Sequence, residues 1–391
     1  MYDLMFLTVL ILPLAAVQVA GHVLVRGFGQ IEPEQQAQRK HHANWIVGLG
    51  LTVQIFGAFL ALEQWGDRMP VTLEIGETLF NGLMSLNDIA GRWVVMAVFV
   101  VVTLAAFAID MILFYRVSFR IDRLAKGIEG NRQAARQQVK LNLRSFIVTI
   151  LPIMAWSAAV AYLQLSPWGD LDKFLLLFLG YLFALYSLSP LMIRLSQPTE
   201  ILPSEHPVTV MALALCRDAS VRVSGIRLLK LGEARVANAM VSGLLPWYRC
   251  IYVTDRMLET FTPEEIRTIL AHEVGHVKKM HLWWYLALGF AGMLVMGQAR
   301  DLLATLLNMP NSMLPGNLAL LLWLGLGFPF FSRVFERQAD RYAVALTGDA
   351  KTFARALEKL ATVNCSVKST GIGEWFGSHP DIAKRVAATM R

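Results

Sequence analysis

Long apolar runs alternate with polar segments along most of this 391-residue chain. A membrane-spanning helix needs about 20 apolar residues, and five runs of about that length precede residue 196. Two shorter runs follow, and the second contains a proline. We therefore expect about seven transmembrane helices, at residues 4–25, 45–62, 93–115, 146–165, 174–193, 282–296 and 318–331. Buried core helices remain an alternative for the last two, because they are short.

The composition and the loop charges agree with a membrane protein. Hydrophobic residues make up 55% of the chain, charged residues only 17%, and the mean hydropathy is +0.48. Residues 116–144 contain eight Lys and Arg, whereas residues 63–91 contain Arg68 alone. Basic loops face the cytoplasm, so we expect a multi-pass protein of a bacterial inner membrane. No basic stretch comes with a nucleic-acid motif, and no nucleic-acid partner is expected.

A more polar segment separates the fifth expected span from the sixth. Three prolines between residues 196 and 207 indicate an extended connection leaving the membrane. The apolar pattern then predicts a helix at 209–219 and strands at 226–231, 236–242 and 250–254. Another helix should begin at Thr262, where Pro263 and Glu265 complete a start signal with a capping box.

That last helix carries the most informative motif, a His-Glu-x-x-His run at residues 272–276. Residues four apart share a helix face, so His272 and His276 can bind one metal ion, while Glu273 can take a proton from water. Downstream, Glu336 would complete a His2Glu ligand set, and Asp340 could accept a hydrogen bond from a ligand histidine. The alternative for these two carboxylates is a solvated charged helix whose arginines form ion pairs.

Two further blocks carry a family resemblance. Asn238-Ala239 precedes the histidine motif, and Ser378-His379-Pro380 followed by Arg385 comes after the Glu336 segment. Together the four blocks, within residues 225–390, resemble the integral-membrane zinc peptidases that include the CAAX prenyl endopeptidases and the HtpX heat-shock proteases. The span arrangement is closer to the prenyl endopeptidases.

The resemblance implies roles that the residues alone do not fix. It places Asn238 and Ala239 on an edge strand that holds the substrate backbone. It brings His379 into the active site, to bind substrate or to stabilise the oxyanion. Arg385 is a weaker candidate for the same contact with substrate, and it could equally pair with Glu336 or Asp340.

The expected fold is a mostly α membrane protein with a small α+β zincin-like catalytic domain. Its expected parts are 1–195 and 282–331 in the membrane, with 196–281 and 332–391 in the cytoplasm. We expect one Zn²⁺ per chain and endopeptidase activity on peptides or membrane proteins, lipidated or not, at the cytoplasmic face. CAAX-prenyl-endopeptidase-like cleavage is the first hypothesis, and HtpX-like degradation of misfolded membrane proteins is the alternative. A zinc-free channel or scaffold is the non-enzyme alternative.

Overall fold

The computed structural model describes residues 132–165, 171–232, 236–308, 314–364 and 385–387, with residues 35, 39, 109, 112 and 116. The expected spans at 4–25 and 45–62, and nearly all of 93–115, lie outside these residues. The chain divides into two compact units, residues 1–135 with 308–317 and residues 136–307 with 318–391. The second unit contains every described residue of the expected site.

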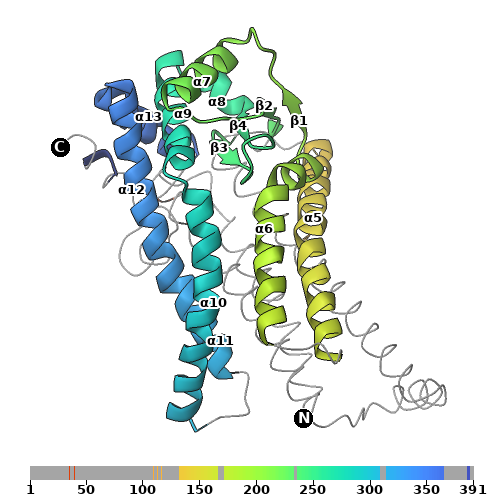
Figure 1. The fold of residues 1–391 in the computed structure, drawn as a ribbon. Helices are drawn as coiled ribbons and strands as arrows, with labels where there is room; N and C mark the ends of the chain where they lie inside the picture. Colours follow the sequence, from red (N-terminus) through yellow and green to blue (C-terminus); the bar gives the residue numbers. More distant parts are fainter. Residues whose placement is uncertain are drawn as a thin grey trace. The chain divides into compact units, whose positions relative to one another are not determined.

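Helices predominate among the described residues (Figure 1). In chain order the elements are α5 (Arg132–Leu165), α6 (Leu171–Ser196), β1 (Thr199–Ile201), α7 (Pro207–Asp218), β2 (Gly225–Leu229), β3 (Ala239–Ser242), β4 (Cys250–Thr254), α8 (Asp255–Thr260), α9 (Pro263–Lys278), α10 (His281–Leu306), α11 (Leu314–Leu322), the π-helix η3 (Trp323–Gly327), α12 (Phe328–Thr347) and α13 (Ala350–Val363).

The strands form one small sheet with the order β1-β2-β4-β3. β2 and β4 are parallel, whereas β1 pairs with β2 and β3 pairs with β4 in antiparallel fashion. All five residues of the central strand β4 are buried, as expected for a strand covered on both faces. β3 is therefore an edge strand of the described sheet.

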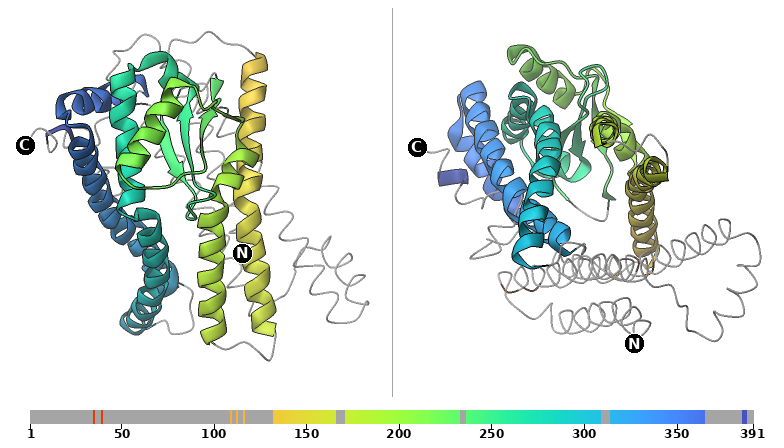
Figure 2. Two further views of the ribbon diagram at one scale, coloured as in Figure 1. Left: turned by 45° about the horizontal axis from the view of Figure 1, so that its top comes forward. Right: turned by 60° about the horizontal axis from the view of Figure 1, so that its bottom comes forward.

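Helix α9 lies between the sheet and the helices α12 and α13 (Figures 1 and 2). It begins as its sequence predicts: Glu265 N–H donates to Thr262 Oγ1 at 3.3 Å, and Thr262 N–H donates to Glu265 Oε2 at 2.9 Å. Its apolar face, including Ile269 and Leu270, is buried with Ile251 of β4. Burial of such a side chain contributes about 1.5–3 kcal/mol, so the core fixes which face of α9 turns outward.

Three described helices are long and apolar enough to cross a membrane, and they cover Lys173–Ser196, His281–Leu306 and Leu318–Thr347. They contain the expected spans 174–193, 282–296 and 318–331. The last two helices are longer than their apolar runs, at 26 and 30 residues, because each continues into more polar sequence. The expected span 146–165 lies within α5, which is not one of the three.

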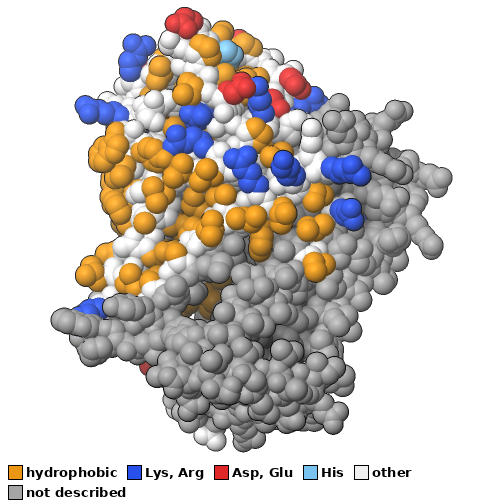
Figure 3. All heavy atoms as spheres, turned by 90° about the vertical axis from the view of Figure 1, so that its right-hand side faces the viewer, with side chains coloured by type: hydrophobic (Ala, Val, Ile, Leu, Met, Phe, Trp, Pro, Cys, Tyr) orange, Lys and Arg blue, Asp and Glu red, His pale blue; other side chains and the backbone are white. Residues whose placement is uncertain are grey.

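The exposed faces of these helices are apolar. On α6, Leu176 is 72% exposed and Leu188 is 49% exposed, and on α10 Trp284 and Leu302 are also exposed. Figure 3 shows hydrophobic side chains in a broad belt, with Lys and Arg side chains along one border of it. A soluble protein rarely exposes so large an apolar surface. The belt indicates contact with lipid, and the basic border suits anionic headgroups.

Hydrogen bonds join the C-terminal end of α6, which we expect on the cytoplasmic side, to the sheet. Tyr252 of β4 donates its hydroxyl to the Pro190 carbonyl at 3.1 Å, and the hydroxyls of Ser189 and Ser242 are 2.7 Å apart. Proline has no N–H to donate, but its carbonyl oxygen can still accept, and Pro190 accepts the bond from Tyr252 in this way. These bonds hold the sheet against the end of a membrane-capable helix.

Candidate metal centre

Two histidines lie side by side on α9. His272 and His276 are one helical turn apart, and their Nε2 atoms are separated by 3.1 Å. Their rings meet edge to face, with centroids 4.8 Å apart. The side chains are only 9% and 13% exposed. The helix thus presents two imidazole nitrogens to one point within a protected space.

Glu336 on α12 faces both imidazoles. Its Oε2 atom is 3.6 Å from His272 Nε2, and its Oε1 atom is 3.5 Å from His276 Nε2. A tetrahedral zinc ion with bonds of about 2.0–2.1 Å separates its ligand atoms by about 3.3–3.4 Å. The three nitrogen and oxygen separations bracket that value. This donor set could therefore hold a metal ion, and its size and chemistry fit zinc.

Small residues let α9 and α12 approach closely enough to bring these ligands together. A Cβ atom at Gly275 would lie 3.2 Å from the Ala339 carbonyl oxygen and 3.3 Å from Tyr342 Cβ. Ala339 and Ala343 are fully buried. Gly275 and Ala339 thus set the separation of the two helices. Gly275 directly precedes His276 on α9, and Ala339 lies between Glu336 and Asp340 on α12.

Asp340 orients His272 from behind. The Asp340 Oδ1 atom lies 2.9 Å from His272 Nδ1. Because a carboxylate can only accept, a proton on Nδ1 suits this neighbour, and that tautomer leaves the Nε2 lone pair for a metal. Asp340 in turn accepts two bonds from Arg385, at 2.9 Å from Nε and at 2.6 Å from Nη2. The guanidinium Nη1 atom also lies 3.4 Å from Glu336 Oε2.

In this arrangement the positive charge of Arg385 is balanced by the carboxylates of Asp340 and Glu336. Burial alone would lower the pKa of Arg385, but the hydrogen bonds and negative charges of Asp340 and Glu336 raise the pKa above its ordinary value. Arg385 is thus the ion-pair partner that the sequence allowed as an alternative. Its expected contact with substrate stays a prediction.

The carboxylates also make the site favourable for positive charge. Burial lowers the pKa of His276, but hydrogen bonding to Glu336 and the charges of Glu273 and Glu336 more than offset this, so the pKa is raised. The same negative potential favours a bound cation at this point. A metal ion and a proton would therefore compete for His276.

Glu273 points from α9 toward the edge of the sheet. Its side chain is partly buried, and Oε2 accepts a hydrogen bond of 2.9 Å from the Val241 N–H of β3. That contact holds the carboxylate between the histidines and the edge strand. A group in this position can take a proton from a water molecule that reaches the metal-facing side of α9.

Asn238 and Ala239 lie at the start of the edge strand. Asn238 N–H donates to Thr254 Oγ1 at 2.9 Å, and Thr254 N–H donates to the Asn238 carbonyl at 3.0 Å. Ala239 is the first residue of β3 and pairs with Val253. The expected strand at 236–242 is too long, because Ala237 bonds instead to the Asn364 side chain, at 2.9 Å through its N–H and at 2.7 Å through its carbonyl.

Two side chains near His276 were not predicted. The Nδ1 atoms of His276 and His281 are 2.9 Å apart, and His281 Nε2 lies 3.0 Å from Gln338 Oε1. His281 follows His276 by five residues, a spacing that does not share a helix face, so no local pattern signals this contact. His379 lies outside the described residues, and its role stays a prediction.

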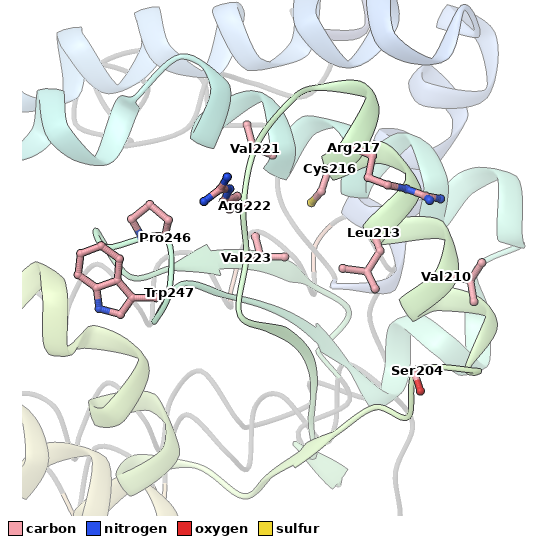
Figure 4. A pocket seen from close by; sticks show the side chains of 10 residues that line it. All are labelled: Ser204, Val210, Leu213, Cys216, Arg217, Val221, Arg222, Val223, Pro246 and Trp247. Carbon is pink, nitrogen blue, oxygen red and sulfur yellow. The ribbon is translucent and has the colours of Figure 1, made fainter.

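A separate pocket of about 600 Å³ lies beside α7 (Figure 4). Its lining includes Leu213, Arg217, Arg222 and Trp247. None of the metal-facing side chains lines it. The lining residue Cys216 is a free, buried cysteine, and burial raises the pKa of this thiol to about 11, which favours the inert thiol.

Comparison with known proteins relates the segment that contains this site to a peptidase family. Residues 214–390 match the family model described as Peptidase family M48. Over this segment the chain is similar to a family of metalloproteases. The match covers both histidines, Glu273, Glu336, Asp340 and Arg385. It implies a metal, typically zinc, at the centre formed by α9 and α12.

Individual relatives extend the likeness beyond that segment. The chain is 27% identical over 226 residues to a Protease HtpX homolog of Aeropyrum pernix, covering 54% of this chain and 70% of the relative. It is 24% identical over 258 residues to a Protease HtpX homolog of Helicobacter acinonychis, covering 58% and 82%. A crystal structure of S. mikatae Ste24p has a TM-score of 0.59 and 17% identity, covering 100% of this chain and 99% of that one. The last comparison shows a shared fold.

Proposed function

We propose that this chain is a zinc-dependent endopeptidase whose single Zn²⁺ is bound by His272, His276 and Glu336. The observation that carries the proposal is the spacing of their donor atoms, 3.1 to 3.6 Å apart, which suits a tetrahedral ion. The similarity of residues 214–390 to Peptidase family M48 supports the same assignment. Asp340 acts behind His272 as its hydrogen-bond acceptor.

Glu273 is the proposed general base. Bound zinc supplies a Lewis acid that lowers the pKa of a water molecule and polarises the scissile carbonyl. Glu273 takes the proton of that water at its carboxylate and later passes it to the leaving amine. Because Val241 N–H already holds one carboxylate oxygen, the base is oriented before substrate arrives. His379 is the proposed oxyanion donor, with Arg385 as the weaker candidate.

The edge strand β3 is the proposed substrate-binding surface. In an antiparallel pair, successive residues point their backbone groups alternately toward and away from the partner strand. Asn238 bonds toward β4, so Ala237, Ala239 and Val241 point away from it. Ala237 bonds to Asn364 and Val241 to Glu273. Ala239 lies between them, and we propose that an extended substrate pairs there, with its scissile carbonyl near Glu273.

The membrane-capable helices support a site at the membrane surface. The His272 helix leads into α10, and α12 returns to place Glu336 beside it. Two passes in opposite directions bring both ligand segments to one side of a bilayer. Together with the eight Lys and Arg residues within 116–144, this supports the proposal that the centre faces the cytoplasm from a bacterial inner membrane.

Two substrate classes have support. The span arrangement expected from the sequence favours a CAAX-prenyl-endopeptidase-like substrate, a prenylated C-terminal peptide, and the shared fold with Ste24p is compatible with it. Sequence similarity to HtpX proteases favours the alternative, degradation of misfolded membrane proteins. Val236 and Ala237 replace the polar pair that usually precedes Asn-Ala in the prenyl endopeptidases. The two classes are separated by offering purified protein a farnesylated peptide and an unfolded membrane protein.

The decisive variant for the chemistry is Glu273→Gln. It keeps the side-chain oxygen that accepts from Val241 but removes the base, so we expect wild-type zinc content and loss of cleavage of both substrates. His272→Ala should lose zinc and cleavage together. A Glu273→Gln protein that still cleaves peptides would refute the assigned base. A wild-type protein without stoichiometric zinc would favour the channel or scaffold alternative.

A further inference from the structure

The second nitrogen of His276 has a built-in partner. His276 Nδ1 lies 2.9 Å from His281 Nδ1, and His281 Nε2 lies 3.0 Å from Gln338 Oε1. Gln338 stands two residues after Glu336 on α12. A chain of hydrogen bonds therefore runs from His276 on α9, through His281 at the start of α10, to Gln338 on α12.

The direction of the protons follows from the chemistry at each end. The Gln338 carbonyl oxygen can only accept, so His281 Nε2 carries a proton. A neutral His281 then has a lone pair on Nδ1, which accepts the proton of His276 Nδ1. That leaves His276 Nε2 without a proton, facing His272 Nε2 and Glu336. The opposite direction would put a proton on His276 Nε2, where a metal must bind.

The position of His281 is strongly enforced. The residue is 1% exposed, and its ring stacks on Phe335, with centroids 4.6 Å apart and an interplanar angle of 16°. Met280, between α9 and α10, has the left-handed φ of 57°, so the chain turns sharply and brings His281 back toward α9. A buried imidazole needs partners for its nitrogens, and one of the two partners here is a proposed metal ligand.

We propose that His281 and Gln338 are positioning residues that fix the tautomer and orientation of His276 for metal binding. The inference rests on the proposed zinc site and adds a second support to it. Asp340 holds His272 through its Nδ1 atom, and His281 holds His276 in the same way. Each ligand histidine of α9 is thereby locked from behind by a different element.

The test compares zinc affinity, measured by competition with a chelator at fixed pH, in variants that keep or remove each acceptor. His281→Phe keeps a stacked aromatic ring but removes the acceptor, and we expect zinc to bind about tenfold to a hundredfold more weakly. Gln338→Met should also lower the zinc affinity. Gln338→Glu keeps an acceptor oxygen and should bind zinc at least as tightly as wild type. Arg337→Gln, at the neighbouring exposed position, should bind zinc as wild type does.

A second measurement separates positioning from general stability. The melting temperature of each variant is recorded without zinc and at saturating zinc. A purely structural role would lower both temperatures equally and leave zinc affinity unchanged. Because Gln338 is exposed, its variants keep the test available if His281→Phe does not fold. Affinities within twofold of wild type for the Phe and Met variants would overturn the proposal, provided that wild type binds one zinc. A wild type that binds none would refute the zinc site itself.

Discussion

Removal of Asp340 should damage folding and metal binding by separate routes. Its carboxylate accepts two hydrogen bonds from Arg385 and lies 2.9 Å from His272 Nδ1, and the side chains of Asp340 and Arg385 are only 5% and 9% exposed. Breaking a buried ion pair by deleting one partner costs about 3–5 kcal/mol. Loss of the hydrogen-bonding partner of a metal ligand weakens metal binding by about tenfold to a hundredfold.

The stability loss in Asp340→Leu should lie toward the lower end of that range. Arg385 keeps a neighbouring carboxylate, because its Nη1 atom lies 3.4 Å from Glu336 Oε2. The freed guanidinium would draw Glu336 away from the metal, so zinc affinity should fall even where the fold survives. Melting temperature without zinc and chelator competition with zinc measure the two effects separately.

The double variant Asp340→Leu with Arg385→Met distinguishes the two routes. It removes the unpaired buried charge, so stability should recover most of the loss. Zinc affinity should stay reduced, because His272 still lacks its acceptor. Full recovery of zinc affinity in the double variant would refute the reasoning that Asp340 acts through His272. Unchanged affinity in the single variant would refute it equally.

Two further predictions concern packing and pH. Gly275→Ala should weaken zinc binding, because the added Cβ would press on Ala339 backbone and separate the two ligand helices; Gly297→Ala, which meets nothing within 4 Å, should bind zinc as wild type does. Burial alone would raise the pKa of Glu265, but the ion pair with Lys359 and the capping bond to Thr262 outweigh this effect, so the pKa is lowered. Glu265→Gln should therefore lower the free energy of unfolding at neutral pH by about 1 kcal/mol, measured as a lower melting temperature. The difference from wild type should vanish as the pH falls through the lowered pKa of Glu265. A difference that persists in acid would contradict this.

Local sequence signals predicted the catalytic helix well. The capping box at Thr262 and Glu265 forms as expected, because it depends on neighbours three residues apart. The four-residue spacing of His272 and His276 likewise needs only a helix to become a shared face. The expected strand at 250–254 matches β4, since a continuous apolar run suits a buried central strand.

Other features depended on partners far along the chain. β1, at Thr199–Ile201, was expected to be an extended connection, and it becomes a strand only because it pairs with β2. The short α8 was missed, although Thr254 caps it by accepting from the Met257 N–H. The strand β3 starts late because Asn364, 127 residues away, takes the backbone groups of Ala237.

The membrane-capable helices show a similar limit. Apolar runs predicted 282–296 and 318–331, but each helix continues beyond its apolar part. α10 extends past Gln298 and Arg300 to Leu306, and α12 carries its apolar end directly into the Glu336 segment. Hydropathy detects the part of a helix in contact with lipid, whereas backbone hydrogen bonding carries the helix on into polar surroundings.

X-ray absorption at the zinc edge, on purified wild-type protein with measured metal content, tests the central claim most directly. We predict one zinc per chain with only nitrogen and oxygen ligands at about 2.0–2.2 Å, and a spectrum that changes in Glu336→Gln. Absence of stoichiometric zinc, sulfur ligands at about 2.3 Å, or a spectrum unaffected by Glu336→Gln would contradict a centre built from His272, His276 and Glu336.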